Sequence, residues 1–214
     1  LKKNYKVLGV TRKINEKNLY RLKLLNIERK IELIKGNAVN FNFVKELIMN
    51  NRNIKEIYYL SGKSSVTKSF SNPIESFKSN VLSIFNILEN VKNENNNIKV
   101  FYAASGQFFG NNKKAFYDEK SKILPQSPYG LSKGAGFWLT KTFRESFGLY
   151  ACSGILFNHE SPLRSKEFVT KKIVDTAKRM KMDKKSKLYL GNIDVFRDWG
   201  WAPEYVNAMW LMLQ

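Results

Sequence analysis

The run VFYAASGQFFG at residues 100–110 is the stretch on which the fold prediction rests. Its first five residues are apolar and predict a buried β-strand. Ser105 and Gln107 follow directly, so a hydroxyl and an amide stand where that strand ends. Strand-like and helix-like patterns alternate along the rest of the chain, which predicts an α/β fold with a mostly parallel sheet and helices on both faces.

The run SPYGLSK at residues 127–133 comes next and predicts the start of a helix. Pro128 is suited to the first helical position, where its missing N–H is not needed. Tyr129 and Lys133 are then one helical turn apart and lie on the same face.

This spacing has a chemical reason. A phenol titrates near pH 10, so Tyr129 is a poor base at neutral pH unless a nearby positive charge stabilises its anion. Lys133 supplies that charge and can also reach a ribose hydroxyl. Ser105 can hydrogen-bond the substrate hydroxyl that Tyr129 deprotonates. Together the three side chains are suited to hydride transfer to a nicotinamide.

Further motifs carry a resemblance to a known family. They are the runs at residues 127–133, 144–152, 154–162, 197–200 and 208–214. Their order resembles the extended short-chain dehydrogenase/reductases and, within them, the GDP-mannose 4,6-dehydratases. The likeness covers nearly the whole chain and is strongest after Gln126.

The resemblance implies a doubly wound Rossmann-like sheet with a partial C-terminal sugar-nucleotide lobe. Residues 1–164 correspond to the NADP-binding domain, and residues 165–214 to part of the substrate lobe interleaved with it. Such a domain begins with a strand and a Gly-rich turn that holds the pyrophosphate. Neither is found before the strand expected at residues 5–11, so the sequence is expected to be a fragment.

The amino-acid composition limits which binding partners and which cellular compartment are expected. The 214 residues carry 37 Lys and Arg against 18 Asp and Glu, a net charge of +19. This charge could attract nucleic acid, but the basic residues are spread along the chain, which favours a solvated surface or an anionic nucleotide sugar. The single cysteine, Cys152, excludes an internal disulfide, fits a reducing cytoplasm and reads as an inert buried thiol. No apolar run is long enough to span a membrane, and no metal is expected.

The cofactor residues fall at predicted strand ends. Arg12 follows the strand at residues 5–11, where an arginine accommodates the 2′-phosphate of NADP; the alternative is a solvated strand-end arginine. The resemblance places Asn37 and Ala38 at the adenine, with Asn37 standing where relatives carry an acidic residue. It also places Leu60, Ser61, Gly62, Lys63 and Ser64 beside the cofactor.

The remaining site residues come from the resemblance. It places His159, the only histidine, and Arg164 at the cofactor, and Asn158 and Glu160 at the substrate. Arg197 could hold the nucleotide diphosphate, because guanidinium matches phosphate oxygens. The equally favoured alternative for Arg197 is an Arg–Asp pair that frames an aromatic core.

The resemblance implies conversion of GDP-mannose, or a similar nucleotide sugar, to a 4-keto-6-deoxy product by internal NADP-mediated redox and water elimination. Ser105, Tyr129 and Lys133 match the family's catalytic positions, but Gln107 stands where a glutamate is the eliminating base. An amide is essentially non-basic. The alternatives are therefore a nucleotide-sugar reductase or epimerase, or a catalytically lapsed homologue. Relatives form dimers or tetramers, so self-association is expected.

The other elements are predicted from periodicity and boundary signals. Strands are expected at residues 5–11, 31–36, 54–60, 98–104, 150–157 and 187–191. Helices are expected at residues 41–51, 73–91, 128–146, 165–182 and 205–214, and a weak helix or loop at 15–25. In the helix at 73–91, one face is expected to carry the apolar residues Ile74, Phe77, Val81, Ile84, Phe85 and Leu88.

Overall fold

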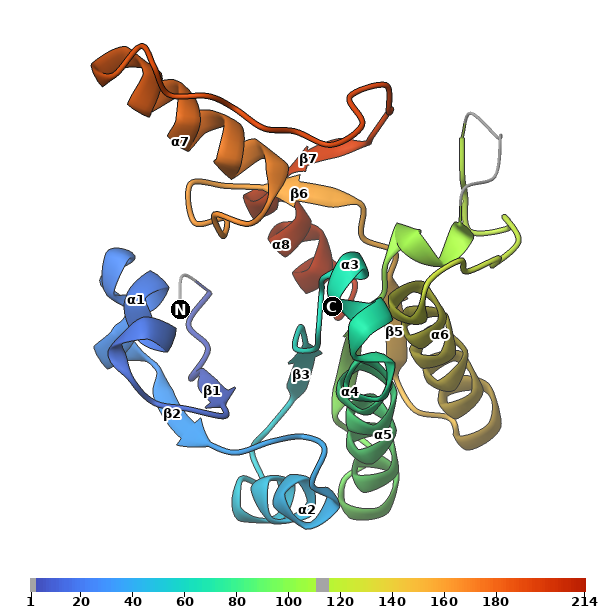
Figure 1. The fold of residues 1–214 in the computed structure, drawn as a ribbon. Coiled ribbons are helices and arrows are strands. Elements are labelled where there is room, and N and C mark those ends of the chain that lie inside the picture. Colours follow the sequence, from blue (N-terminus) through green and yellow to red (C-terminus); the bar gives the residue numbers. More distant parts are fainter. Residues whose placement is uncertain (1–2, 111–115) are drawn as a thin grey trace. The chain divides into compact units, whose positions relative to one another are not determined.

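The computed structural model describes residues 3–110 and 116–214 and shows an α/β protein of two compact units (Figure 1). Unit 1 comprises residues 1–155 with Leu213, and unit 2 comprises residues 156–212 with Gln214. The expected functional division at residues 164/165 stays a prediction.

Every strand pairing of unit 1 is parallel, as the alternating pattern predicted. β1 (Leu8–Thr11) pairs with β2 (Glu32–Lys35), and β3 (Glu56–Tyr59), β4 (Lys99–Ala103) and β5 (Ala151–Gly154) form a second sheet in that order. The register of the second sheet aligns Tyr59 with Tyr102 and Ala103 with Gly154. The carboxyl ends of its strands therefore meet at one edge.

β4 is the centre of the core. Val100, Phe101 and Tyr102 are fully buried, because the strand is paired on both sides and covered on its faces. Parallel strands of this kind are rich in apolar residues on both faces rather than alternating. The apolar run at residues 100–104 thus supplies the central strand of the second sheet.

Helices of unit 1 follow the predicted order. They are α1 (Glu16–Leu24), α2 (Phe41–Asn50), α3 (Val66–Ser71), α4 (Pro73–Phe77), α5 (Ser83–Glu94) and α6 (Pro128–Phe147), with the 3-10 turns η1 (Glu28–Lys30) and η3 (Gly106–Phe109). α2 packs on α5, and α5 packs on α6. α3 was not predicted, because its six residues are too short to show a helical period.

The long helix expected at residues 73–91 is interrupted by a π-helical turn, η2 (Lys78–Leu82). A π turn adds a residue to the helix and rotates everything after it relative to what came before. The predicted apolar face is therefore only partly right. Val81, Ile84 and Leu88 are buried, whereas Ile74, Phe77 and Phe85 are exposed.

Unit 2 is smaller and less regular. It contains β6 (Asn158–Glu160) paired in parallel with β7 (Trp199–Trp201), and the helices α7 (Val169–Met182) and α8 (Ala202–Leu211). The strand predicted at residues 187–191 is wrong, since that segment is irregular and mostly exposed. Asn158 and His159, which follow the strand expected at residues 150–157, form a strand of their own paired with β7. Three-residue strands leave too little pattern to detect.

No helix within the described ranges is both long enough and apolar enough to cross a membrane.

Candidate active site

Local capping fixes the start of α6. Ser127 is the N-cap, and its Oγ accepts a hydrogen bond from the Gly130 N–H at 3.0 Å. Pro128 occupies the first helical position, as predicted. At the other end, Gly148 closes the helix in the left-handed conformation with φ 67°. These caps hold Tyr129 and Lys133 in the first two turns.

Tyr129 and Lys133 are both buried and lie close together, with the Lys133 Nζ 6.0 Å from the centroid of the Tyr129 ring. The same Nζ lies 5.1 Å from the centroid of the Tyr102 ring and donates a hydrogen bond to the Ala103 carbonyl at 2.7 Å. Burial lowers the pKa of Lys133 to about 8. A cation beside the phenol favours its anionic form, so the geometry suits Tyr129 to act as a base.

Ser105 lies two residues beyond Ala103, the carbonyl that Lys133 contacts. It is buried and caps η3, with its Oγ accepting from the Gln107 N–H at 3.3 Å. The backbone of η3 packs against the first turn of α6, because a Cβ built at Gly130 would lie 2.7 Å from the Gln107 carbonyl oxygen. The structure therefore brings Ser105, Tyr129 and Lys133 to the carboxyl end of β4.

Gln107 lies on the exposed side of the same turn. Its backbone carbonyl lies beside Gly130, the residue after Tyr129, and its side chain is an amide. An amide cannot accept a proton at neutral pH.

The loop after β3 contains the predicted cofactor residues Leu60 to Ser64, all exposed. Lys63, at the centre of this loop, is held by hydrogen bonds to both its backbone N–H and its backbone carbonyl. The Lys63 N–H donates to the Ser79 Oγ at 3.2 Å, and the Lys63 carbonyl accepts from the Asn80 Nδ2 at 3.2 Å. Gly62 has φ +129°, a conformation that glycine adopts without strain.

Arg12 directly follows β1, Asn37 lies two residues beyond the end of β2, and both are exposed. Burial raises the pKa of Tyr59, and the charge of Arg12 partly opposes that shift. The Asn37 Oδ1 accepts from the Val39 N–H at 3.2 Å, which fixes the amide orientation. The Ala38 carbonyl accepts from the Asn86 Nδ2 at 2.9 Å.

In unit 2, the predicted residues around β6 form a connected group. The His159 ring stacks on the Tyr205 ring with centroids 4.8 Å apart, and its Nδ1 lies 2.9 Å from the Phe157 carbonyl oxygen. Glu160 accepts from the Thr170 hydroxyl at 2.6 Å and forms an ion pair with Arg164 at 3.2 Å. Arg164 also lies 3.7 Å over the Phe168 ring. Both charged groups therefore have protein partners already.

Arg197 is exposed, and its Nη1 donates to the neighbouring Phe196 carbonyl at 2.7 Å. Asp198 is also exposed, and Trp199 and Trp201 are each about half exposed. An exposed pair cannot frame a packed core, so that alternative for Arg197 is wrong. Asn158 is partly buried in β6.

Several residues that hold the site were missed by sequence reasoning. Asn80 is fully buried and bonds both the Lys63 carbonyl and Ser132, Ser69 accepts from the Tyr129 N–H at 3.1 Å, and the Tyr102 hydroxyl points at the Lys133 carbonyl. One signal was available. Asparagine is unfavourable inside a helix, so Asn80, Asn86 and Asn90 in a buried helix indicate specific hydrogen bonds.

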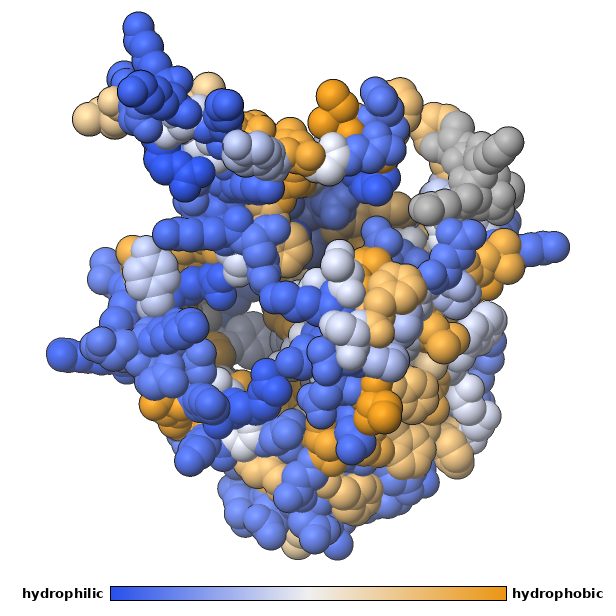
Figure 2. Space-filling view, in the orientation of Figure 1, coloured by the Kyte–Doolittle hydropathy of each residue, from blue (hydrophilic) through white to orange (hydrophobic). Residues whose placement is uncertain are grey.

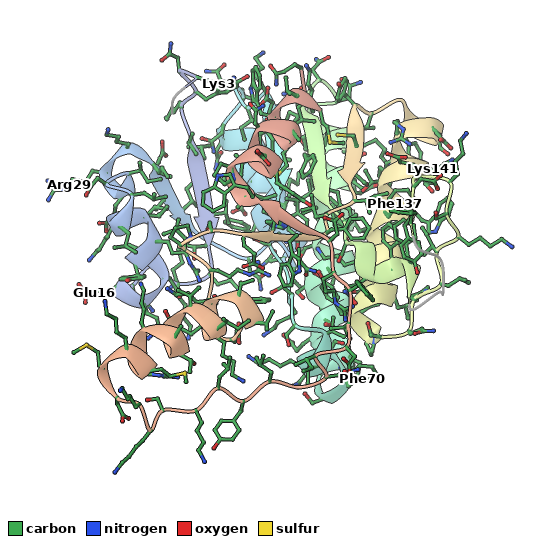
Figure 3. All side chains as sticks on the ribbon, turned by 90° about the horizontal axis from the view of Figure 1, so that it is seen from above. Lys3, Glu16, Arg29, Phe70, Phe137 and Lys141 are labelled. Carbon is green, nitrogen blue, oxygen red and sulfur yellow. The ribbon has the colours of Figure 1, made fainter. Side chains whose placement is uncertain are left out.

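Two further features lie outside this group. A cavity of about 240 Å³ is bounded by η3, residues 119–123 and α6, and the rings of Phe137 and Trp138 form part of its wall (Figure 3 labels Phe137).

Cys152 is half-buried, and burial raises its pKa, which fits an unreactive thiol. Within residues 3–110 and 116–214, no three or more His, Cys, Asp or Glu side chains are grouped as a metal site.

Comparison with known sequences shows what the chain is similar to. The sequence model described as GDP-mannose 4,6 dehydratase matches residues 1–214. GDP-mannose 4,6 dehydratase 1 of Arabidopsis thaliana is 44% identical over 163 residues, which cover 74% of this chain and 45% of the relative. The Drosophila melanogaster enzyme is 33% identical over 222 residues, covering 100% of this chain and 56% of the relative. The chain thus spans about half the length of these curated relatives.

Solved structures confirm the Rossmann-like fold. The dTDP-glucose 4,6-dehydratase of Bacillus anthracis, in complex with NAD, superposes with a TM-score of 0.83 at 20% identity, covering 99% of this chain and 64% of that one. RMD of Pseudomonas aeruginosa, complexed with NADPH, superposes with a TM-score of 0.78 at 21% identity, covering 97% and 74%.

Proposed function

Because the chain belongs to the GDP-mannose 4,6-dehydratase family, we propose that it carries the redox centre of a nucleotide-sugar 4,6-dehydratase acting on GDP-mannose. The observation that carries this proposal is the buried Tyr129–Lys133 pair beside Ser105 at the end of β4. The side chains of Ser105, Tyr129 and Lys133 each have the chemistry that their proposed role needs. The register of β4 and the N-cap of α6 fix the elements that carry them.

In the proposed reaction Tyr129 removes the proton of the C4 hydroxyl, and Ser105 orients that hydroxyl by a hydrogen bond. Lys133 stabilises the tyrosinate and binds a ribose hydroxyl. A bound NADP supplies the hydride acceptor at C4 and the hydride donor at C6. The ketone at C4 acidifies the proton at C5, and water leaves from C6.

Removal of the C5 proton is the step in which this chain departs from its relatives. Gln107 occupies the position of the expected carboxylate, and an amide in place of a base commonly costs a factor of about 10² to 10⁴. This observation keeps a reductase or epimerase as the second candidate, since neither needs the eliminating base. It is also the reason to test for a catalytically lapsed homologue.

We infer NADP rather than NAD from Arg12, an exposed residue that directly follows β1, where a guanidinium can accommodate a 2′-phosphate. Support for a nicotinamide cofactor comes from the relatives solved with NAD and NADPH. Asn37, Ala38 and residues 60–64 are proposed to line the cofactor site. In unit 2, His159 and Arg164 are proposed for the cofactor, and Asn158, Glu160 and Arg197 for the nucleotide sugar.

The cofactor site also needs a further strand. In the doubly wound strand order, one strand stands between those that correspond to β1 and β3. Within the described residues, β1 pairs only with β2, and β3 only with β4. We infer that a strand with a Gly-rich turn pairs with both, and that residues 1–164 then form the NADP-binding domain and residues 165–214 part of the substrate lobe.

A second copy of the chain is the proposed partner of an apolar surface on the helices. Figure 2 shows apolar side chains over α4, α5 and α6. The exposed apolar residues of these helices are Ile74, Phe77, Phe85, Leu131, Trp138 and Phe147. Apolar side chains that gather on an exposed surface mark a protein interface. Light scattering should give twice or four times the mass of the chain.

Incubation of the purified protein with NADP and GDP-mannose tests the function. A product that has lost water and carries a 4-ketone supports the dehydratase. A 4-epimer or a reduced sugar identifies the second candidate, and tight NADP binding without turnover identifies a lapsed enzyme. The protein should bind NADP once a segment that supplies the proposed strand and Gly-rich turn is added. Failure to bind it then would contradict the dehydratase, the reductase or epimerase, and the lapsed homologue alike.

A further inference from the structure

Lys133 has a second aromatic neighbour, which the proposed reaction does not use. Tyr102 belongs to β4 and is fully buried, with 0% of its surface exposed. The Lys133 Nζ lies 5.1 Å from the centroid of the Tyr102 ring, nearer than the 6.0 Å that separates it from the centroid of the Tyr129 ring. A cation at such a distance over an aromatic face is attracted to it. Tyr102 is therefore the closer of the two rings to this charge.

The ammonium of Lys133 needs such a partner because it is removed from water. Only 6% of Lys133 is exposed, and burial disfavours the charged form of a lysine. Among the residues that the structure describes, its polar partner is the Ala103 carbonyl at 2.7 Å, and no carboxylate acts on it. The face of the Tyr102 ring thus replaces part of the hydration that the ammonium loses.

The Tyr102 ring is held by the elements on either side of it. Its hydroxyl end packs against α6, where a Cβ built at Gly136 would lie 2.3 Å from the hydroxyl oxygen. The hydroxyl also lies 3.5 Å from the Lys133 backbone carbonyl oxygen. From β3, the Tyr59 ring stacks on it with centroids 6.2 Å apart and planes 9° apart. Lys133 therefore packs against a ring whose place is set by β3 and α6.

The two phenols beside Lys133 differ in what they can do. Burial raises the pKa of Tyr102 well above its ordinary value, and the neighbouring Tyr129 and Tyr59 add to that shift. Tyr102 has no exposed surface, whereas Tyr129 is 8% exposed. Tyr102 thus presents a neutral ring to Lys133 and does not compete with Tyr129 as a base.

We propose that Tyr102 is a positioning residue of the redox centre, whose ring keeps the Lys133 ammonium charged and beside Tyr129. Its effect on C4 oxidation rests on the proposed function, since Tyr129 is the proposed base. Its hold on Lys133 does not depend on that function, and it can be measured in the free protein.

The Tyr102→Leu variant tests the hold on Lys133. The leucine keeps an apolar side chain in the core but removes the ring. We expect the pKa of Lys133 to fall from about 8 to about 7, a change of about tenfold in proton affinity, because that is the size of a cation–π contact away from water.

Urea unfolding at several pH values measures this pKa. Each protein is compared with its own Lys133→Met version, so the difference reports Lys133 alone, while Tyr59, Tyr129 and the Arg12 charge that acts on Tyr59 are the same in both members of a pair. The contribution of Lys133 to the free energy of unfolding rises with pH once the folded chain begins to lose the proton. The rise should begin about one pH unit lower in Tyr102→Leu, and an unchanged onset would overturn the proposal.

Two matched controls separate the ring from the hydroxyl and from core packing. Tyr102→Phe keeps the ring and removes the hydroxyl, so the onset should stay near that of the unmodified protein. Phe101→Leu removes an equally buried ring from the next position of β4, on the other face of the strand, and should also leave the onset unchanged. A shift in either control as large as that in Tyr102→Leu would overturn the proposal.

Gly136→Ala provides the same test if Tyr102→Leu does not fold. The new methyl group displaces the hydroxyl end of Tyr102, while Tyr102 and Lys133 both remain. The onset of the rise should again move to lower pH. An unchanged onset would overturn the proposal.

Single-turnover oxidation of GDP-mannose by NADP tests the catalytic consequence. In Tyr102→Leu we expect the rate of C4 oxidation at neutral pH to fall by about tenfold and its rise with pH to move to higher pH, because the Tyr129 anion loses part of its stabilising charge. The KM for GDP-mannose should not change, and Tyr102→Phe should keep the rate.

The two levels fail in different ways. A lowered pKa of Lys133 in a protein that does not oxidise GDP-mannose leaves Tyr102 as the partner of Lys133 and removes the proposed function. Oxidation that is unaffected by Tyr102→Leu leaves the proposed function and overturns the role of Tyr102.

Discussion

The first turns of α6 and the irregular segment at residues 183–198 represent two ways in which this chain presents charged residues. In α6, Lys133 is buried, makes a hydrogen bond at 2.7 Å and has a pKa lowered to about 8. In the segment at 183–198, Arg197 is exposed and bonds its neighbour's carbonyl. A residue in the first setting has its geometry fixed before any ligand arrives. A residue in the second lacks such a packed setting.

The largest effect should come from removing the buried charge. In Lys133→Met we expect the rate of C4 oxidation to fall by a factor of about 10² to 10⁴, because nothing then stabilises the Tyr129 anion. The measurement is NADPH absorbance in a single turnover. Lys141→Met, on the same helix but only half-buried and paired with Glu145, is the control (Figure 3 labels Lys141) and should leave the rate unchanged. An equal loss of the C4 oxidation rate in both variants would show that the buried position of Lys133 is not what matters.

Gln107→Glu should act in the opposite direction. The new carboxylate stands two residues from Ser105, in η3, and is a group that can accept the C5 proton, so the rate of water elimination should rise by about a hundredfold. The 4-keto-6-deoxy product, measured by mass spectrometry, reports it. No gain, with C4 oxidation intact, would show that another group is the base.

Two glycines give the sharpest contrast in stability. A Cβ at Gly136 would lie 2.3 Å from the Tyr102 hydroxyl oxygen, whereas a Cβ at Gly191 meets no atom within 4 Å. We expect Gly136→Ala to lower the free energy of unfolding by about 1–3 kcal/mol through overpacking, and Gly191→Ala to change it by less than about 0.5 kcal/mol. Urea unfolding measures both. A similar loss in the two variants would contradict the contrast in packing.

The buried lysine also predicts a pH dependence. Its pKa of about 8 in the folded chain lies below the ordinary 10.5, so between these values the unfolded chain binds more protons. The free energy of unfolding should therefore rise from about pH 8 to pH 10, relative to Lys133→Met, and be flat below pH 8. The raised pKa of Tyr102 acts only above this window. Urea midpoints of the two proteins at several pH values test the difference, and parallel curves would contradict it.

The smallest effect on stability should come from Arg197→Ala. The side chain is exposed, so the free energy of unfolding should change by less than about 0.5 kcal/mol. Affinity for GDP-mannose should nevertheless fall if the guanidinium holds the diphosphate. Calorimetric titration measures this, with Lys187→Ala in the same segment as the control. Unchanged affinity would remove Arg197 from the proposed substrate site.

The contrast between packed and irregular regions also explains which parts of the structure could be predicted from the sequence. The strands around β4, the start of α6 at Pro128 and the shared helix face of Tyr129 and Lys133 were predicted correctly, because long apolar runs and a proline at a helix start leave a local signal. The roles of the site residues stay predictions. The π turn was not predictable from period alone, because it depends on buried bonds from Asn80 to residues far away in sequence. The pairing of β6 with β7 joins segments that are short and distant, so neither shows a pattern of its own.

The arrangement of unit 1 as two small sheets has a practical consequence for handling the protein. Within the described residues, β1 pairs only with β2 and β3 only with β4, so each has one side without a partner strand. Strand edges of this kind recruit strands from other molecules. Preparations of this chain alone are thus expected to aggregate on concentration, and a peptide that docks along those edges should keep them dispersed.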